Sequence, residues 1–223
     1  MRHASATRSA GTMSRMLPAR TSATAPPGQP KPGLRERKKI QTRQAIRRAA
    51  LRLFAAQGYD ATPTDRIAEA AEVSPSTVFR YFPAKEDIVL TDEYNALLAD
   101  GIRARPAGEP FAETLRHVTV GIMRGISATD REELLQRIRL IRDVPAVRGR
   151  TAELTARHID TISTALAERT GRPADDLGIR VIGAAALAAL QEAMLRWAEE
   201  SRTASPEELI HRSMDVLAHG LTL

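Results

Sequence analysis

Two helix-start signals that lie twelve residues apart constrain the fold of this 223-residue chain more than any other feature. Thr62-Pro63 and Ser74-Pro75 each combine a hydroxyl residue suited to an N-cap with a proline suited to the first helical position. Pro83 prevents the second helix from continuing. The pattern predicts two short helices, over 63–71 and 75–81, joined by a tight turn.

A longer helix precedes this pair. Its apolar residues recur at helical spacing on one face: Ile46, Ala50, Leu53 and Phe54. Gly58 is typical of a helix end, so the helix is predicted over about 34–57. Together the three helices form a helix-turn-helix domain, predicted for residues 34–90, with the motif at about 63–82.

The rest of the chain shows helical periodicity interrupted by proline, glycine and serine. Helices are expected at about 84–103, 111–127, 130–143, 145–170, 174–201 and 206–220. No segment alternates polar and apolar residues as a half-buried strand would. The expected fold class is therefore all-α, with the helix-turn-helix domain followed by a second helical domain over 91–223. Residues 1–33 lack an apolar period and are predicted to be a disordered basic tail.

The composition excludes several classes of site. The absence of cysteine excludes disulfide scaffolds, thiol nucleophiles and cysteine-based zinc sites. The five histidines show no metal-ligand spacing, and no phosphate-binding glycine loop or nucleophile elbow occurs. We therefore expect no metal, no cofactor and no enzymatic activity. The longest strongly apolar stretch, 181–190, is too short to cross a bilayer, which predicts a cytoplasmic protein without a membrane partner.

The net charge of +6 is distributed unevenly. Residues 1–33 carry five basic and no acidic residues, and residues 34–90 carry 11 basic and 7 acidic residues. Residues 91–223 carry 17 basic and 20 acidic residues, so the excess positive charge lies entirely in the first 90 residues. Such a distribution indicates either an N-terminal part that binds a polyanion or a solvated tail on a chain with no such partner.

The second short helix presents the residues that best fit nucleic acid. Val78 and Phe82 face inward, whereas the outward residues are Ser76, Thr77 and Arg80, flanked by Phe79 and Tyr81. Arginine donates two hydrogen bonds to guanine, and short hydroxyls reach base edges or phosphates. The free N–H groups at the helix start suit a phosphate. The alternative is an ordinary helical hairpin with no ligand.

Residues 42–90 contain several short motifs in unbroken order: Thr42-Arg43, Ala49-Ala50-Leu51-Arg52-Leu53-Phe54, Gly58-Tyr59, Ile67-Ala68-Glu69-Ala70-Ala71, Val73-Ser74, Thr77-Val78-Phe79-Arg80-Tyr81-Phe82 and Lys85-Glu86-Asp87. This order resembles the N-terminal DNA-binding domain of TetR-family transcriptional regulators. The resemblance implies that the third helix reads the major groove and that Thr42, Thr62, Tyr81 and Lys85 touch phosphates. Two positions depart from the family pattern, Glu72 at a turn glycine and Thr64 at a commonly apolar site.

The candidate DNA-binding residues are those of the predicted motif and its flanks: Thr42, Arg43, Thr62, Thr64, Ser74, Pro75, Ser76, Thr77, Phe79, Arg80, Tyr81 and Lys85. In the family that the chain resembles, the remaining helices bind a ligand and form a dimer. The helix over 174–201 is apolar nearly all round, and the last helix has an apolar face. We predict that both pair with a second copy through Ile182, Ala186, Leu190, Met194, Trp197, Ile210, Met214 and Leu217. The alternative is a monomer core.

One arginine of the helix over 130–143 suggests a ligand site. On a helical wheel Arg142 lies between Ile138 and Leu135, inside the apolar arc, where a guanidinium needs an anionic partner. Candidate ligand-binding residues are Arg142, Ile138, His117, Met123 and His158. The segments 137–145 and 168–172 resemble TetR-type regulators that bind acyl-CoA-like ligands, which implies an acyl or other apolar effector. A structural ion pair or a solvent-facing side chain is the alternative for Arg142.

These expectations combine into one functional hypothesis. The chain is expected to be a homodimeric repressor of its own or neighbouring genes, bound to a palindromic double-stranded DNA operator at the nucleoid and released by a small molecule. One alternative is an architectural DNA-binding dimer that responds to no effector. The other is a helical enzyme or scaffold with a coincidental helical hairpin.

Overall fold

The computed structural model describes residues 33–200 and 204–220. The predicted tail therefore lies outside the described residues except for Gly33, and it stays a prediction. Eleven helices and no strand occur in the described part, which confirms the all-α fold class. The helices are α1 (Leu34–Gln57), α2 (Thr64–Ala70), α3 (Pro75–Tyr81), α4 (Glu86–Val89), α5 (Asn95–Ala104), α6 (Phe111–Gly125), α7 (Ala128–Asp143), α8 (Pro145–Gly149), α9 (Thr151–Thr170), α10 (Leu177–Glu200) and α11 (Pro206–Ala218).

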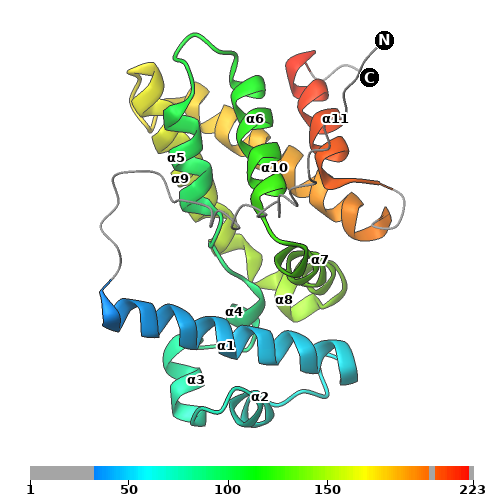
Figure 1. The fold of residues 1–223 in the computed structure, drawn as a ribbon. Helices are drawn as coiled ribbons and strands as arrows, with labels where there is room; N and C mark the ends of the chain where they lie inside the picture. Colours follow the sequence, from blue (N-terminus) through cyan, green and yellow to red (C-terminus); the bar gives the residue numbers. More distant parts are fainter. Residues whose placement is uncertain (1–32, 201–203, 221–223) are drawn as a thin grey trace, which may run out of the picture.

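Helices α1 to α4 form the head of the molecule, defined here as residues 34–90. In Figure 1, α1 lies across the molecule, with α2 and α3 below it and the remaining helices above. The head is held together by a core of buried apolar side chains from all four helices, among them Ile46, Phe54, Ile67, Val78 and Ile88. Burial of this apolar surface is the main contribution that fixes the short helices α2 and α3, which are too short to be stable alone.

Helices α5 to α11 form the body. Its core contains Ile102, Leu115, Leu135, Trp197 and Met214, all of them buried. The helix α10 packs against α7, α9 and α11, and α6 packs against α5 and α11. The predicted helix over 111–127 corresponds to α6, and that over 130–143 corresponds to α7.

The head core continues into the body. Val147 of α8 is fully buried among the head residues, and Leu140, Ile141 and Val144 pack against the same cluster. The helix α7 contacts α1 and α4, so it is covered by the head on one side and by α10 on the other.

Two predicted helices are each divided into two. The segment expected as one helix over 84–103 is broken between α4 and α5, where Leu90 is extended and the Thr91 hydroxyl accepts a hydrogen bond from the Glu93 backbone N–H at 3.1 Å. Such local side-chain bonds compete with the helical ladder. The helix expected over 145–170 is broken at Arg150, where α8 turns Val147 into the head core.

Candidate nucleic-acid interface

The start of α3 is capped as the sequence predicts. The Ser74 hydroxyl accepts a hydrogen bond from the Thr77 backbone N–H at 3.2 Å, and Pro75 occupies the first helical position. The Ser74 hydroxyl also lies 2.9 Å from the hydroxyls of Ser76 and Thr77. This cap confirms one of the two predicted helix starts and fixes where the exposed face of α3 begins.

The turn between α2 and α3 requires a left-handed backbone. Glu72 has a φ of 55°, the one positive φ of a non-glycine residue among those described. Its backbone N–H donates to the Glu69 carbonyl, and the next N–H donates to the Ala68 carbonyl. A residue with a Cβ atom is strained in this conformation, which explains why the family pattern has glycine where this chain has glutamate.

Replacement of Glu72 by glycine is therefore expected to stabilise the head. The free energy of unfolding should rise by about 0.5–1 kcal/mol, because glycine adopts the left-handed conformation without steric cost. Thermal denaturation followed by circular dichroism measures the change. The matched control is Ala70→Gly on exposed α2, which should lower stability by about 1 kcal/mol. A Glu72→Gly variant that is no more stable than wild type would contradict the strain argument.

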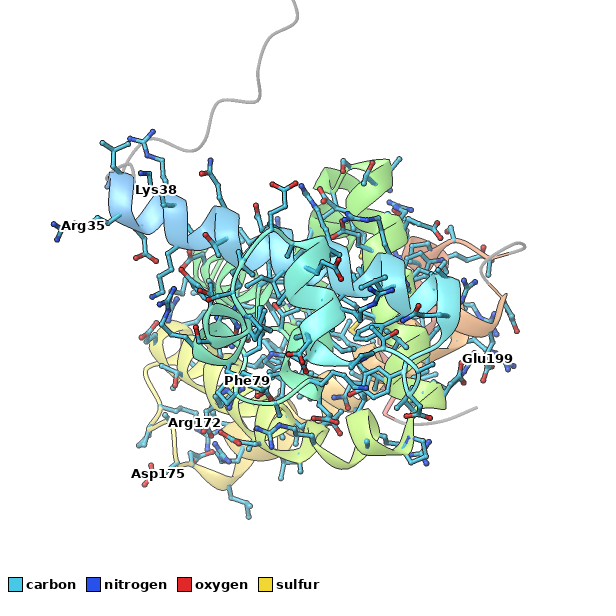
Figure 2. All side chains as sticks on the ribbon, turned by 90° about the horizontal axis from the view of Figure 1, so that it is seen from below. Arg35, Lys38, Phe79, Arg172, Asp175 and Glu199 are labelled. Carbon is cyan, nitrogen blue, oxygen red and sulfur yellow. The ribbon has the colours of Figure 1, made fainter. Side chains whose placement is uncertain are left out.

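The outward face of α3 agrees with the predicted one at Ser76 and Arg80, whereas Thr77 is half-buried. Val78 and Phe82 are buried in the head core, and Ser76, Phe79 and Arg80 are exposed. The Arg80 guanidinium carbon lies 5.3 Å from the centre of the Tyr81 ring, a cation–π contact that restrains the arginine. Figure 2 views the molecule from the end that the head forms, and Phe79 is labelled there.

Basic residues of α1 flank α3. The Arg43 guanidinium carbon lies 5.0 Å from the Phe82 ring centre, which places Arg43 beside the C-terminal end of α3. The Thr42 hydroxyl donates to the Lys38 carbonyl at 2.9 Å. Arg35 and Lys38 extend from the N-terminal part of α1 (Figure 2). These side chains suit phosphates on either side of a groove.

Thr62 is not the cap that the sequence predicts. The helix α2 begins at Thr64, with Pro63 before it, and Thr62 is fully buried. Its hydroxyl donates to the Gly58 carbonyl at 2.7 Å and accepts from the Gln57 side-chain amide at 3.1 Å. Thr62 closes the loop after α1, so it is unavailable to a phosphate in this structure. Thr64 is half-buried and remains a candidate.

Lys85 also makes internal contacts. Its ammonium donates to the carbonyls of Tyr59 at 2.9 Å and Thr62 at 3.2 Å, and it lies 4.1 Å from the centre of the Tyr59 ring. The Tyr59 hydroxyl donates to Glu86 at 2.9 Å, and burial raises the pKa of Tyr59. Lys85 therefore ties α4 to the loop after α1. A phosphate contact for Lys85 stays a prediction.

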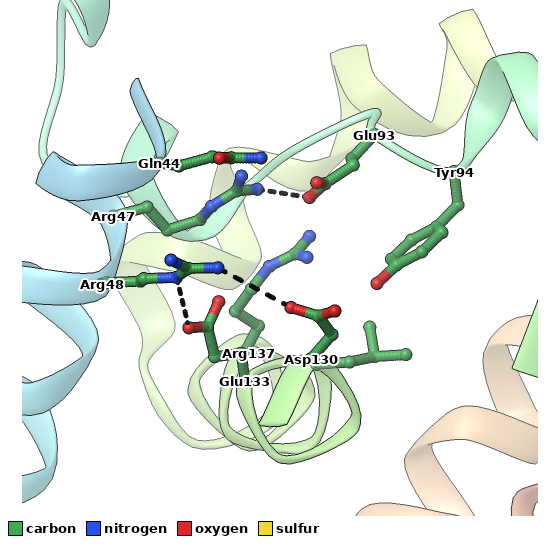
Figure 3. A pocket seen from close by; sticks show the side chains of 9 residues that line it. Gln44, Arg47, Arg48, Glu93, Tyr94, Asp130, Glu133 and Arg137 are labelled. Carbon is green, nitrogen blue, oxygen red and sulfur yellow. Dashed lines mark hydrogen bonds and ion pairs between the residues drawn. The ribbon is translucent and has the colours of Figure 1, made fainter. Parts of the chain in front are cut away.

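Two arginines of α1 bind the body instead of pointing to the candidate interface. The side chain of Arg47 is almost buried and lies 2.7 Å from Glu93. Arg48 donates to Glu133 at 3.1 Å and lies 3.9 Å from Asp130 (Figure 3). These residues line a cavity of about 30 Å³ between head and body, which has room for roughly one water molecule. Two of the positive charges of the head are thus neutralised away from the candidate interface.

The prediction that Arg142 lies inside the buried face of its helix is wrong, and the alternative of a structural ion pair is the one that the structure shows. Arg142 lies in the last turn of α7 and forms a two-bond ion pair with the exposed Asp143, at 2.6 and 2.9 Å. The buried arginine of α7 is Arg137, whose Nε donates to the Val89 carbonyl at 2.9 Å and whose Nη2 lies 3.5 Å from the Thr91 carbonyl. Burial lowers the pKa of Arg137 to about 10. The helical wheel selected the wrong arginine because α7 has a second buried face, which packs against the head.

The other candidate ligand residues lie apart. Met123 and Ile138 are packed into the body core. His117, in contrast, is exposed, and its Nδ1 lies 2.8 Å from the Glu113 carbonyl of its own helix. His158 is half-buried on α9, and burial lowers its pKa. Among the residues that the structure describes, no group of three His, Cys, Asp or Glu side chains could hold a metal ion.

The predicted dimer residues divide into two groups. Ala186, Trp197, Ile210 and Met214 are buried within the body, so their assignment to an interface is wrong. Leu190, Met194 and Leu217 are half-buried, and Ile182 is exposed. Periodicity cannot distinguish which of two apolar faces the chain itself covers.

The structure adds exposed apolar residues that the sequence analysis did not select. Leu177 is 78% exposed and Val181 is 56% exposed on α10, and Val216 is exposed on α11. By length and composition α10 would also be apolar enough to cross a membrane, with 28% of its apolar window buried. An apolar surface of this kind indicates a contact that the single chain does not supply.

Comparison with known proteins places these features in a family. Residues 46–91 match the model for bacterial regulatory proteins of the tetR family, and residues 109–222 match the model for the MftR C-terminal domain. The HTH-type transcriptional regulator TcmR of Streptomyces glaucescens is 36% identical over 158 residues, which cover 65% of this chain and 67% of TcmR.

Two further relatives extend over most of the chain. The putative mycofactocin biosynthesis transcriptional regulator MftR of Mycobacterium tuberculosis is 25% identical over 193 residues, 83% of this chain and 93% of that protein. The crystal structure of Thermus thermophilus FadR, a TetR-family repressor in complex with lauroyl-CoA, has a TM-score of 0.52 and 26% identity, and covers 81% of this chain and 95% of its own.

Proposed function

Because the chain belongs to the TetR family of DNA-binding transcriptional regulators, we propose that it acts as a homodimeric repressor that a small molecule releases from a palindromic operator. The proposal places it in the cytoplasm, at the nucleoid. The observation that supports it most is the face of α3, on which Ser76, Phe79 and Arg80 are exposed beside the basic side chains of α1.

The geometry of α3 suits a major groove. Its buried residues Val78 and Phe82 anchor it to the head, and the Ser74 cap fixes where its exposed face begins. Arg80 then reaches guanine acceptors, and the hydroxyls of Ser76 and Thr77 reach bases or phosphates. The α1 side chains Thr42 and Arg43 fix the register without reading sequence.

An operator footprint tests this proposal. Purified protein should protect a short palindrome upstream of its own or a neighbouring gene, with two half-sites about one helical turn apart. Absence of any protected sequence in these regions would refute a repressor of these genes.

Arg80→Ala should weaken binding by about 1–3 kcal/mol at one base position and relax specificity there. Fluorescence anisotropy on the footprinted operator and its single-base variants measures this. Arg124→Ala, which removes the same charge from exposed α6 in the body, should leave operator affinity unchanged. Equal losses of Arg80→Ala on operator and random DNA would show that Arg80 contacts phosphate and does not read a base.

The proposed dimer pairs α10 and α11 with the same helices of a second copy. Leu177, Val181, Ile182 and Val216 supply the exposed apolar surface for this contact. A twofold interface presents the same patch on both copies. It would hold the two copies of α3, the helices proposed to read the DNA, at the spacing of successive major grooves.

The proposed effector is acyl or otherwise apolar. The lauroyl-CoA bound to the Thermus relative supports this chemistry. Met123 and Ile138, however, are already packed in the body core, as expected for the alternative of an architectural dimer without effector. Titration of the protein–operator complex with lauroyl-CoA distinguishes the two: release supports the effector model, and unchanged affinity for this and other apolar ligands supports the architectural dimer.

A further inference from the structure

We propose that Phe79 reads a thymine in the operator by contact with its 5-methyl group. This inference rests on the proposed function, because it assumes that α3 enters the major groove. It assigns to one side chain a specific chemical group of DNA, distinct from the hydrogen bonds of Arg80 and from the phosphate contacts of α1.

The exposure of Phe79 is unusual among the phenylalanine and tyrosine residues of the head. Its side chain is 53% exposed, and it is the one aromatic residue among the large apolar side chains that the structure leaves exposed in the described part of the chain. The other rings of the head are held by neighbours: Phe54 packs 4.9 Å from Tyr59, and Phe82 is buried under Arg43. Phe79 is thus an apolar ring on a face that is otherwise polar.

The position of Phe79 is fixed by its neighbours along α3. Val78 is fully buried in the head core, and Phe79, rotated from it by about 100° around the helix, is exposed. Ser76 and Arg80 are exposed on the same outer surface, three residues before and one residue after the ring. A phenylalanine has only two side-chain torsions, so holding its ring in one position has a low entropic cost.

The chemistry of the ring restricts what it can recognise. Phenylalanine has no hydrogen-bonding group, so it reads neither the donors and acceptors of the base edges nor the phosphates. In the major groove thymine alone presents a methyl group, and apolar side chains discriminate this base by burying that methyl. A face that combines Phe79 with Arg80 therefore specifies a thymine near the guanine that Arg80 contacts.

Deoxyuridine provides the test, because it differs from thymidine only by the absence of the 5-methyl group. An operator is first obtained by selection from random duplex DNA with the full-length protein. Each thymine is then replaced singly by deoxyuridine, and dissociation constants are measured by fluorescence anisotropy. We expect wild type to lose about fourfold in affinity at one thymine of each half-site, the value for loss of one buried methyl group.

The variants assign this loss to a residue. Phe79→Ala should bind thymine and deoxyuridine at that position equally, and Phe79→Leu should keep part of the difference. Leu97→Ala is the matched control, since it removes an equally exposed apolar side chain from α5 in the body but should keep the full deoxyuridine effect. Circular dichroism checks that the variants fold. If Phe79→Ala does not fold, the test rests on Phe79→Leu, which should show a smaller deoxyuridine effect than wild type.

Two results would overturn the inference while leaving the proposed function intact. One is specific binding by wild type with no deoxyuridine effect at any thymine. The other is a Phe79→Ala variant that retains the full effect. If wild type selects no sequence at all, the DNA-reading role of α3 fails and the inference fails with it.

Discussion

Val181→Glu is expected to convert the proposed dimer to a monomer and to abolish high-affinity operator binding. In the single chain Val181 is 56% exposed, so a charge there costs the monomer little. In the proposed interface each glutamate would be taken out of water, and burial of a charge costs several kcal/mol. The dimer dissociation constant should rise at least about 100-fold, which corresponds to about 2.7 kcal/mol. Operator affinity should fall with it, because two linked reading helices bind far more tightly than one.

The control for this variant is Leu97→Glu on α5. Leu97 is 54% exposed, so both substitutions place the same charge at an equally accessible apolar site. Leu97→Glu should remain dimeric in analytical ultracentrifugation and bind the operator as wild type does. If Leu97→Glu dissociates and Val181→Glu does not, the interface lies elsewhere than α10 and α11.

Arg137→Ala should destabilise the protein by about 2–4 kcal/mol. Arg137 is 7% exposed and binds the carbonyls of Val89 and Thr91, the residues that lead from α4 toward α5. Its removal leaves two carbonyls without this donor and a cavity between head and body, both of which cost free energy. Urea denaturation at fixed protein concentration measures the loss, since the stability of a dimer depends on concentration.

Arg142→Ala is the matched control on the same helix. Arg142 is bonded to the neighbouring exposed Asp143, and a surface ion pair of this kind contributes at most about 1 kcal/mol. Arg137→Met adds a second comparison, since it keeps much of the volume but removes every donor. If Arg142→Ala costs as much as Arg137→Ala, the buried contacts are not the source of the effect.

The contacts around Arg137 also suggest how the body controls the head. Arg150 forms two hydrogen bonds with Asp87, at 2.6 and 3.2 Å, and the Gln136 side chain donates to the Leu51 carbonyl. These bonds run from α7 and the segment before α9 to α1 and α4, the helices that carry α3. An effector that favours a different position of α7 would shift the reading helices by its difference in affinity for the two states.

The helix-turn-helix was predictable because its signals are local. The Ser74 cap with Pro75, the end of α1 at Gly58 and the inward Val78 each depend on residues within one or two turns. The strain at Glu72 was likewise visible from one residue in a turn. At these positions the structure is determined by backbone sterics and by capping hydrogen bonds. Both act between residues that are close in the sequence, so the sequence pattern reveals them.

The residues whose burial or exposure was predicted wrongly have a different explanation. Arg137 is buried and Arg142 is not because α7 is covered on two sides, by the head and by α10. Trp197 and Met214 are core residues, whereas Leu177 and Val181 are exposed, because α11 and α9 cover one face of α10 and leave the other. A hydrophobic period shows that a face is apolar but carries no information about which distant helix covers it. The chain alone therefore determines the helices and the reading motif, and long-range packing determines which apolar and charged side chains are left for a partner.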